Sequence, residues 1–314
     1  MNVQGLALPA AWLAVIALFG ALEPDTFLTS ANLQGILGSQ AVLVVVTLGL
    51  LFPLCAGDYD LSVASTLTLA AMIVALLNAR HGWPVVPAIL VAVAAGVLVG
   101  AVNGALVTLL ELESLVVTLG SGTFVSGVTL WISDSNTIGG ISASLVDPVI
   151  AWDLLGIPLS FFYGLLLCAI VWLVLDHAPV GRRLLFTGRG RDVARLSGVR
   201  VGRVRFGALV TAGGIAAVAG VLYAGTTGSA DPSSGASFLL QAFAAAFLGA
   251  TSIAPGRFNA WGALIAAYFL ATGVTGLQLI GVESFVQDLF YGAALIVAVA
   301  LPRLLRAATQ PHSP

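Results

Sequence analysis

Long runs of apolar residues, separated by short polar stretches, make up most of this chain. A bilayer core of about 30 Å is crossed by a helix of about 20 apolar residues. On that measure the pattern predicts an all-α, polytopic transmembrane bundle of about ten spans. The segments that start at 62 and 236 are candidates for broken or re-entrant helices. The ten predicted segments are 6–22, 33–54, 62–79, 84–109, 115–132, 157–175, 206–225, 236–253, 258–278 and 284–301.

The composition indicates a membrane protein and excludes some chemistry. The 314 residues are 59% hydrophobic and 8% charged, with a mean hydropathy of +1.06, whereas soluble domains carry about 25% charge. Lys is absent, which excludes a GxxxxGK[ST] phosphate-binding loop. Cys55 and Cys168 lie in apolar segments and are interpreted as packed thiols. Because no two histidines have ligand spacing, we expect neither a metal nor a cofactor in this chain.

Arginine is concentrated between the sixth and seventh apolar segments. Basic residues next to membrane spans stay in the cytosol, so this basic region, 176–205, is predicted to be cytosolic. Six spans precede it and four follow, which places both termini in the cytosol as well. Eleven of the twelve Arg then lie on the cytosolic side, and Arg80 is the exception. Eight of them lie in the basic region, namely Arg182, Arg183, Arg189, Arg191, Arg195, Arg200, Arg203 and Arg205.

A short capped helix is predicted inside the basic region. Asp192 is the expected N-cap and Gly198 the expected residue after the C-terminus, and Val193 and Leu196 form an apolar face. The alternative is a loop on anionic headgroups, where each Arg contributes about 1 kcal/mol. Lipid attraction does not require a capped helix with apolar side chains, so we favour a cytosolic protein partner. The predicted coupling residues are Arg189, Arg191, Asp192, Val193, Ala194, Arg195, Leu196, Ser197 and Gly198.

Polar residues within or beside the apolar segments are candidates for a translocation path or a helix break. A carboxylate at the centre of a membrane helix costs about 2.5–3.5 kcal/mol, so Asp58 and Asp60 should lie at an interface or face a protein-lined cavity. Asp60 or Ser62 is expected to cap the following helix. The alternatives are a turn at the membrane surface and, for the helix residues, an interhelical hydrogen bond. The full candidate set is Asp58, Asp60, Ser62, Asn103, Thr118, Ser121 and Gln241.

Glycine recurs at every fourth position along the fourth apolar segment. Gly96, Gly100 and Gly104 therefore form a flat stripe on one face of the predicted helix. Such stripes let a second helix approach closely in a membrane. We predict that these glycines serve helix packing.

Six motifs in matching order and spacing identify a family resemblance. The chain resembles the permease subunits of bacterial ABC importers of the ribose and monosaccharide type, which are related to branched-chain amino acid permeases. It departs from the family pattern at Asp58, Ala64 and Ala250, where the family has Gly. The motifs that carry the resemblance are Gly57–Val63 (GGxDLSVG in the family), Asn103–Thr108 (NGxLVT), Val117–Gly120 (VTLGT), Ala194–Gly198 (AARLSGI), Leu248–Ser252 (LGGTS) and Gly256–Gly262 (GRGxxxGT).

The resemblance implies a multi-pass permease in the bacterial inner membrane. Residues 1–306 would form one permease domain and 307–314 a short tail. The permease would pair with a second copy or a paralogue, while a separate cytosolic ATPase supplies hydrolysis and an external binding protein delivers a sugar or similar small polar solute. No nucleic-acid partner is implied. By position, 191–198 would be the helix that docks on the ATPase.

The residues alone leave other functions open. A permease of the same superfamily for an amino acid or a nucleoside fits the same motifs. An ion-coupled secondary transporter would need intramembrane carboxylates, for which Asp58, Asp60 and Asp288 are the nearest candidates. A membrane-embedded enzyme would need a cluster of catalytic polar groups, and the sequence contains no such constellation.

Overall fold

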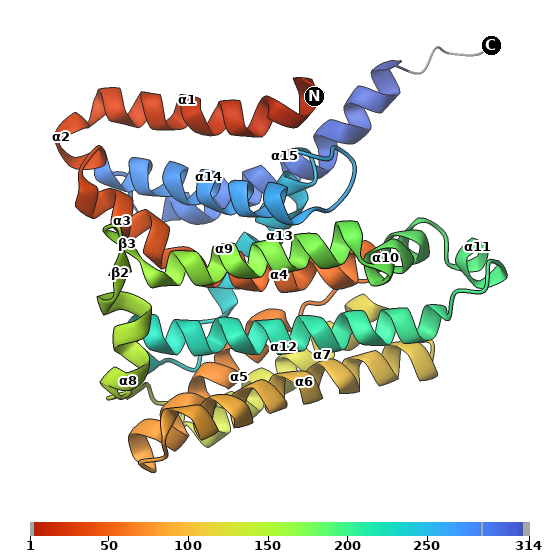
Figure 1. Ribbon diagram of the computed structural model, residues 1–314, viewed down its shortest axis with the longest axis horizontal. Coiled ribbons are helices and arrows are strands. Elements are labelled where there is room, and N and C mark those ends of the chain that lie inside the picture. Colours follow the sequence, from red (N-terminus) through yellow and green to blue (C-terminus); the bar gives the residue numbers. More distant parts are fainter. Residues whose placement is uncertain (1–2, 284, 310–314) are drawn as a thin grey trace.

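The computed structural model describes residues 3–283 and 285–309, and it is a bundle of helices with short strands in its loops (Figure 1). The elements in chain order are η1 (Val3–Leu6), α1 (Ala7–Leu22), α2 (Pro24–Phe27), α3 (Ser30–Ser39), α4 (Ala41–Ala56), α5 (Val63–Ala75), η2 (Leu76–Arg80), α6 (Val85–Leu109), α7 (Ser114–Ile132), β1 (Ile138–Gly139), α8 (Ala143–Val146), η3 (Asp147–Ala151), β2 (Asp153–Leu154), β3 (Ile157–Pro158), α9 (Leu159–Trp172), η4 (Leu173–His177), α10 (Pro179–Arg189), α11 (Arg191–Leu196), α12 (Val201–Thr227), β4 (Ser229–Ala230), α13 (Ala236–Gly249), α14 (Ala260–Leu279) and α15 (Phe285–Thr309).

Each of the ten predicted apolar segments contains a helix, but the helices differ in length. In the described part of the chain, seven are long and apolar enough to cross a membrane: Ser30–Ala56, Val63–Arg80, Val85–Leu109, Ser114–Ile132, Leu159–His177, Val201–Thr227 and Ala260–Leu279. Three apolar helices are shorter: Ala7–Leu22, Ala236–Gly249 and Phe285–Ala300. The all-α membrane bundle is therefore confirmed, with seven helices that meet the length criterion.

The helix ends differ most from the predicted boundaries in three places. α12 begins at Val201 rather than at 206, and α13 ends at Gly249 rather than at 253. α15 continues to Thr309, so the predicted tail from 307 begins as helix, and the rest of that tail lies outside the described residues. α12 and α15 are longer than predicted because backbone hydrogen bonding continues into flanking polar residues, which a hydropathy pattern does not mark.

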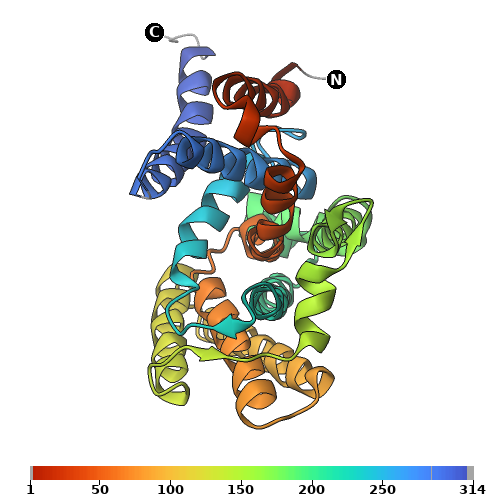
Figure 2. The ribbon, with the colours of Figure 1, turned by 90° about the vertical axis from the view of Figure 1, so that its left-hand side faces the viewer.

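The centre of the bundle is α4. All sixteen of its residues are buried, and a helix that is apolar all round belongs in the interior of a bundle. α12 runs beside it and makes its most extensive contacts with α6, α4 and α5. Seen along the bundle, α7 and α13 lie on one side and α9 on the other (Figure 2).

The glycine stripe of α6 lies against α12. A Cβ atom on Gly104 would come within 2.8 Å of Phe206 Cδ2, and one on Gly100 within 2.9 Å of Val210 Cα. On α12, Gly213 faces the backbone of Gly96 and Gly100 in the same way. The two backbones thus touch without intervening side chains, the arrangement that small residues permit in membranes.

Two loops distant in sequence meet at the end of the bundle away from α11 (Figure 1). β1 pairs antiparallel with β4, and Thr137 Oγ1 donates a hydrogen bond of 2.6 Å to Asp231 Oδ2. Hydrogen bonds from Ser233 and Thr137 lower the pKa of the Asp231 carboxyl below its usual value. Asp147 and Pro148 begin the helical segment η3.

Candidate functional site

Residues 57–62 are not helical and form a break between α4 and α5. α4 ends at Gly57, whose φ of +78° is left-handed, a conformation that glycine adopts without strain. Irregular backbone at membrane depth must find hydrogen-bond partners in the protein, and α7 supplies them. The Tyr59 N–H donates to Ser114 Oγ at 3.1 Å, and the Leu61 N–H donates to Thr118 Oγ1 at 3.0 Å. The break is therefore attached to the first turns of α7.

Asp60 closes a local turn at the start of α5. Its Oδ1 accepts hydrogen bonds from the Ser62 N–H at 2.9 Å and from Ser62 Oγ at 2.6 Å, and Asn103 Nδ2 on α6 donates to Ser62 Oγ at 2.8 Å. The predicted side-chain cap is wrong. Ser62 holds the N-cap position in a helical backbone conformation and makes no side-chain cap bond. All three side chains are buried, so this cluster joins α5 to α6.

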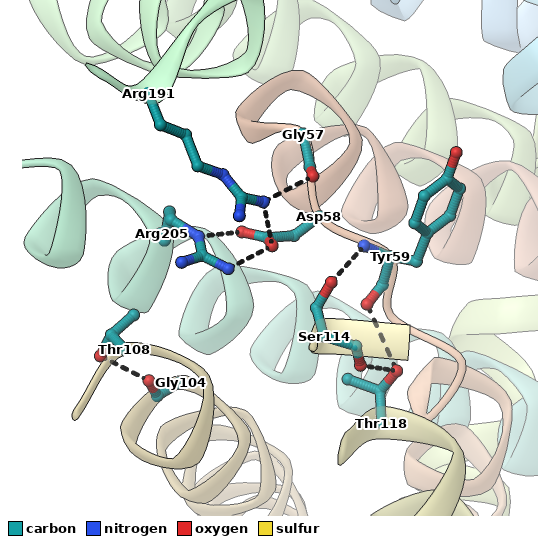
Figure 3. Close-up of polar contacts among 9 residues, drawn as sticks. All are labelled: Gly57, Asp58, Tyr59, Gly104, Thr108, Ser114, Thr118, Arg191 and Arg205. Carbon is teal, nitrogen blue, oxygen red and sulfur yellow. Dashed lines mark hydrogen bonds and ion pairs between the residues drawn. The ribbon is translucent and has the colours of Figure 1, made fainter. Parts of the chain in front are cut away.

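Asp58 is a fully buried carboxylate between two arginines (Figure 3). Arg205 of α12 binds both of its oxygens, Nε to Oδ2 and Nη2 to Oδ1, each at 2.7 Å. Arg191 of α11 donates from Nη2 to Asp58 Oδ1 and to the Gly57 carbonyl, each at 3.0 Å. These contacts form an ion-pair cluster that joins α11, α12 and the break.

A hollow of about 350 Å³ lies between α5, α7 and the start of α13. Ser126 Oγ on α7 donates to Ser65 Oγ on α5 at 3.0 Å at its wall. No charged side chain is among its lining residues in the described part of the chain. It is lined by Leu61, Ala64, Ser65, Thr68, Leu119, Gly122, Thr123, Ser126, Leu130, Pro232, Ser233, Ala236 and Leu239. Such a surface offers hydroxyl donors and acceptors to a neutral polar molecule.

None of the predicted path residues is among the residues that line the hollow. Six are buried, namely Asp58, Asp60, Ser62, Asn103, Thr118 and Gln241. Ser121 is half-buried and donates to the Thr118 carbonyl at 3.3 Å. Hydrogen bonds of Asp58, Ser62, Asn103 and Thr118 instead connect the break and the start of α5 to α6, α7 and α12.

The basic region forms two helices at one end of the bundle, α10 and α11 (Figure 1). Ala194 is buried, whereas Leu196 is 89% exposed and Val193 is 59% exposed. Gly198 follows the C-terminus in a left-handed conformation with φ +83°, as predicted. Asp192 is not the N-cap, because the helix begins one residue earlier at Arg191 and extended Gly190 holds that position. Asp192 is the second residue of α11, and its negative charge complements the positive N-terminal end of the helix dipole.

Comparison with known proteins identifies the family. The model of the family described as "Branched-chain amino acid transport system / permease component" matches residues 32–299. The chain belongs to this family. The family resemblance drawn from the six motifs is thereby confirmed.

Relatives named as sugar permeases align with nearly the whole permease. The D-allose transport system permease protein AlsC of Escherichia coli K12 is 32% identical over 291 residues, which are 93% of this chain and 89% of AlsC. The ribose import permease protein RbsC of Bacillus subtilis 168 is 32% identical over 296 residues, 94% of this chain and 92% of RbsC. The xylose transport system permease protein XylH of E. coli K12 is 25% identical over an alignment of 359 positions, 95% of this chain and 91% of XylH. No solved structure matches.

Two features of the permease were missed by reasoning from the sequence. The lining hydroxyls Ser65, Thr68, Thr123 and Ser126 were not singled out as path residues, although each pair is spaced i, i+3 and so shares a helix face. The pairing of Asp58 with two arginines had no local signal, because its partners are distant in the sequence.

Proposed function

We propose that this permease is the translocation subunit of an ATP-driven importer for a sugar or a similar small polar solute. The observation that supports this most directly is the hollow between α5, α7 and α13, whose polar lining consists of serine and threonine hydroxyls. Hydroxyls both donate and accept hydrogen bonds and so match the hydroxyls of a sugar. Relatives named for allose, ribose and xylose transport support the same solute class.

An amino acid is the second candidate solute, because the family description names branched-chain amino acids. An amino acid carries an ammonium and a carboxylate, and both charges need partners when they leave water. The uncharged lining of the hollow offers none. This difference favours the sugar.

We further infer that the permease works in the bacterial inner membrane with three partners. A second permease copy or paralogue would close the hollow, which lies on the face formed by α7 and α13; α7 also exposes large apolar side chains there and nearby, including Leu119 and Leu130. A cytosolic ATPase would bind α11, whose Leu196 has no cover in the described chain. An external binding protein would deliver the solute at the end where β1 pairs with β4.

Uptake into proteoliposomes tests the function. The permease would be reconstituted with its ATPase and binding protein and offered labelled ribose, allose, xylose or leucine. We expect sugar uptake that requires ATP and continues when proton and sodium gradients are dissipated at constant ATP. Uptake that stops when the gradients are dissipated, or that accepts leucine alone, would contradict the proposal.

Filling the hollow is expected to block transport. Ser126 lines the hollow and donates a hydrogen bond to Ser65 at its wall, so Ser126→Phe places a ring in the space that the solute would occupy. We expect uptake to fall to background while the permease still co-purifies with the ATPase. Ser126→Ala is the matched control, because it removes the hydroxyl without adding bulk. It should lose about 0.5–1.5 kcal/mol of hydrogen bonding at most and retain measurable uptake.

We propose ten membrane crossings with both termini in the cytosol. The helix α13 has 14 residues, about 21 Å at 1.5 Å per residue, so the non-helical residues before it would complete that crossing. The ion pair between Arg80 and Asp134 (3.5 Å) supports this arrangement, because it joins two loops that would both lie outside, one after the third span and one after the fifth. The basic helices α10 and α11 lie at the opposite end of the bundle (Figure 1).

Thiol labelling tests this orientation. Cys55 and Cys168 are both buried, so an introduced cysteine should dominate the signal. Leu196→Cys, at a site 89% exposed in α11, should react with an impermeant maleimide only after the membrane is opened. Leu155→Cys, at a site 92% exposed in the loop between the fifth and sixth spans, which would lie outside, should react in intact cells. Reaction of Leu196→Cys in intact cells would invert the topology and exclude ATPase docking there.

A further inference from the structure

The charged side chain of Arg191 links the helix α11 to the membrane helices by an ion pair and a hydrogen bond. The guanidinium reaches from the first residue of α11 to Asp58 Oδ1 and to the Gly57 carbonyl, each at 3.0 Å (Figure 3). Both acceptors belong to the break that follows α4. The end of α10 also touches this point, since a Cβ on Gly57 would lie 3.4 Å from Gly188 Cα. The surface that we assign to the ATPase therefore meets the break directly.

The two arginines on Asp58 are not equivalent. The Arg205 side chain is 11% exposed and holds both carboxylate oxygens at 2.7 Å, the bidentate geometry that is strongest for a guanidinium and a carboxylate. The Arg191 side chain is 43% exposed and binds one oxygen at 3.0 Å. Removal of the second pair would leave Asp58 neutralised by Arg205. The Arg191 contact is thus the one that can change without leaving a buried charge unpaired.

From Asp58 the contacts continue to the hollow. The next residue, Tyr59, donates from its N–H to Ser114 Oγ, and its carbonyl accepts from Thr118 Oγ1 at 3.3 Å. Ser114 and Thr118 lie in the first turns of α7. Two turns further along α7, Gly122 and Ser126 line the hollow. Hydrogen bonds, the backbone from Asp58 to Tyr59 and one helix therefore join α11 to the wall of the hollow, the kind of contiguous contact through which sites are coupled.

We propose that Asp58 is a positioning residue for transport, and that Arg191 transmits movement of α11 to the break and to α7. When the ATPase displaces α11, Arg191 pulls on Asp58 and on the Gly57 carbonyl. Gly57 is left-handed and can change its dihedral angles at little cost, so the break serves as the hinge. Arg205 keeps the carboxylate neutralised throughout. This role rests on the proposed function, because it requires an ATPase on α11.

The test is the number of solute molecules taken up per ATP hydrolysed by the reconstituted permease–ATPase complex. Arg191→Gln should still co-purify with the ATPase, but uptake per ATP should fall at least about fivefold, the lower end of measured coupling between sites. Arg191→Lys should recover part of the loss. Arg203→Gln is the matched control. Arg203 lies two residues before Arg205, is exposed and makes no ion pair in the described chain. Its replacement removes the same charge, and the variant should behave as the unmodified protein.

Asp58→Asn separates this role from direct contact of Arg191 with the ATPase. The Asp58 side chain is 0% exposed, so the ATPase cannot touch it, yet the substitution weakens the same contact from the other side. Uptake per ATP should fall as for Arg191→Gln, and the double variant should lose no more than either single one. If Asp58→Asn does not fold, the inference is still tested by the comparison of Arg191→Gln, Arg191→Lys and Arg203→Gln.

Three results would overturn the inference: unchanged uptake per ATP in Arg191→Gln, an equal loss in Arg203→Gln, or loss of ATPase co-purification in Arg191→Gln. The last would make Arg191 a docking residue. If the unmodified complex took up no sugar with ATP, the proposed function would fail instead, so the two failures are distinguishable.

Discussion

Replacing Arg195 by Glu and Leu196 by Asp together is expected to abolish association with the ATPase while leaving the permease in the membrane. Leu196 is 89% exposed at the end of α11, and Arg195 beside it is also exposed. An exposed apolar side chain next to a cation, on a short helix anchored by buried Ala194, is what a partner groove would receive. Truncating one interface hot spot costs about 2 kcal/mol or more, and here a charge is also reversed against the partner.

Co-purification of the ATPase with a tagged permease measures this effect. The matched control is Arg80→Glu with Leu155→Asp, which makes the same two changes at the opposite end of the bundle. Leu155 is 92% exposed and Arg80 is exposed in a surface ion pair, so the control should leave folding and ATPase binding intact. Normal ATPase recovery with the α11 variant would show that docking occurs elsewhere.

The substitution Gly213→Ala is expected to destabilise the bundle, although it adds a single methyl group. The new Cβ would overlap the Gly96 carbonyl oxygen and come within 3.1 Å of Gly100 Cα, and a backbone cannot move aside as a flexible side chain does. Overpacking of this kind costs about 1–3 kcal/mol or more. Gly207→Ala on the same helix is the control. It meets nothing within 4 Å, and replacing a helical Gly by Ala is favourable by up to about 1 kcal/mol.

The difference in stability between the two variants is measured by thermal unfolding in detergent, with a thiol-reactive dye as the probe. Both native cysteines are buried and become reactive on unfolding. The two alanine variants should shift the midpoint in opposite directions, Gly213→Ala downward and Gly207→Ala upward or not at all. A midpoint for Gly213→Ala equal to that of the unmodified protein would show that α6 and α12 are not in backbone contact.

The positions of the helices could be predicted from the sequence, because membrane solvation imposes a local rule. Each span must satisfy its own backbone hydrogen bonds and present apolar side chains, so hydropathy along the chain locates it without knowledge of its neighbours. The glycine stripe of α6 follows from periodicity in the same way. Motif order and spacing identified the family. Helix ends were less well predicted, because α12 and α15 extend through polar residues that the apolar pattern does not count.

The site depended on pairings that no local pattern contains. Asp58 meets Arg191 and Arg205, which are 133 and 147 residues away, and α4, α11 and α12 must be assembled before the three side chains meet. The hollow likewise combines residues of α5, α7 and α13. Local patterns along the chain are enough to locate the helices, the basic end and the family. The partners of Asp58 and the lining of the hollow depend on the fold, because a buried charge or a cavity is defined by neighbours that only packing brings together.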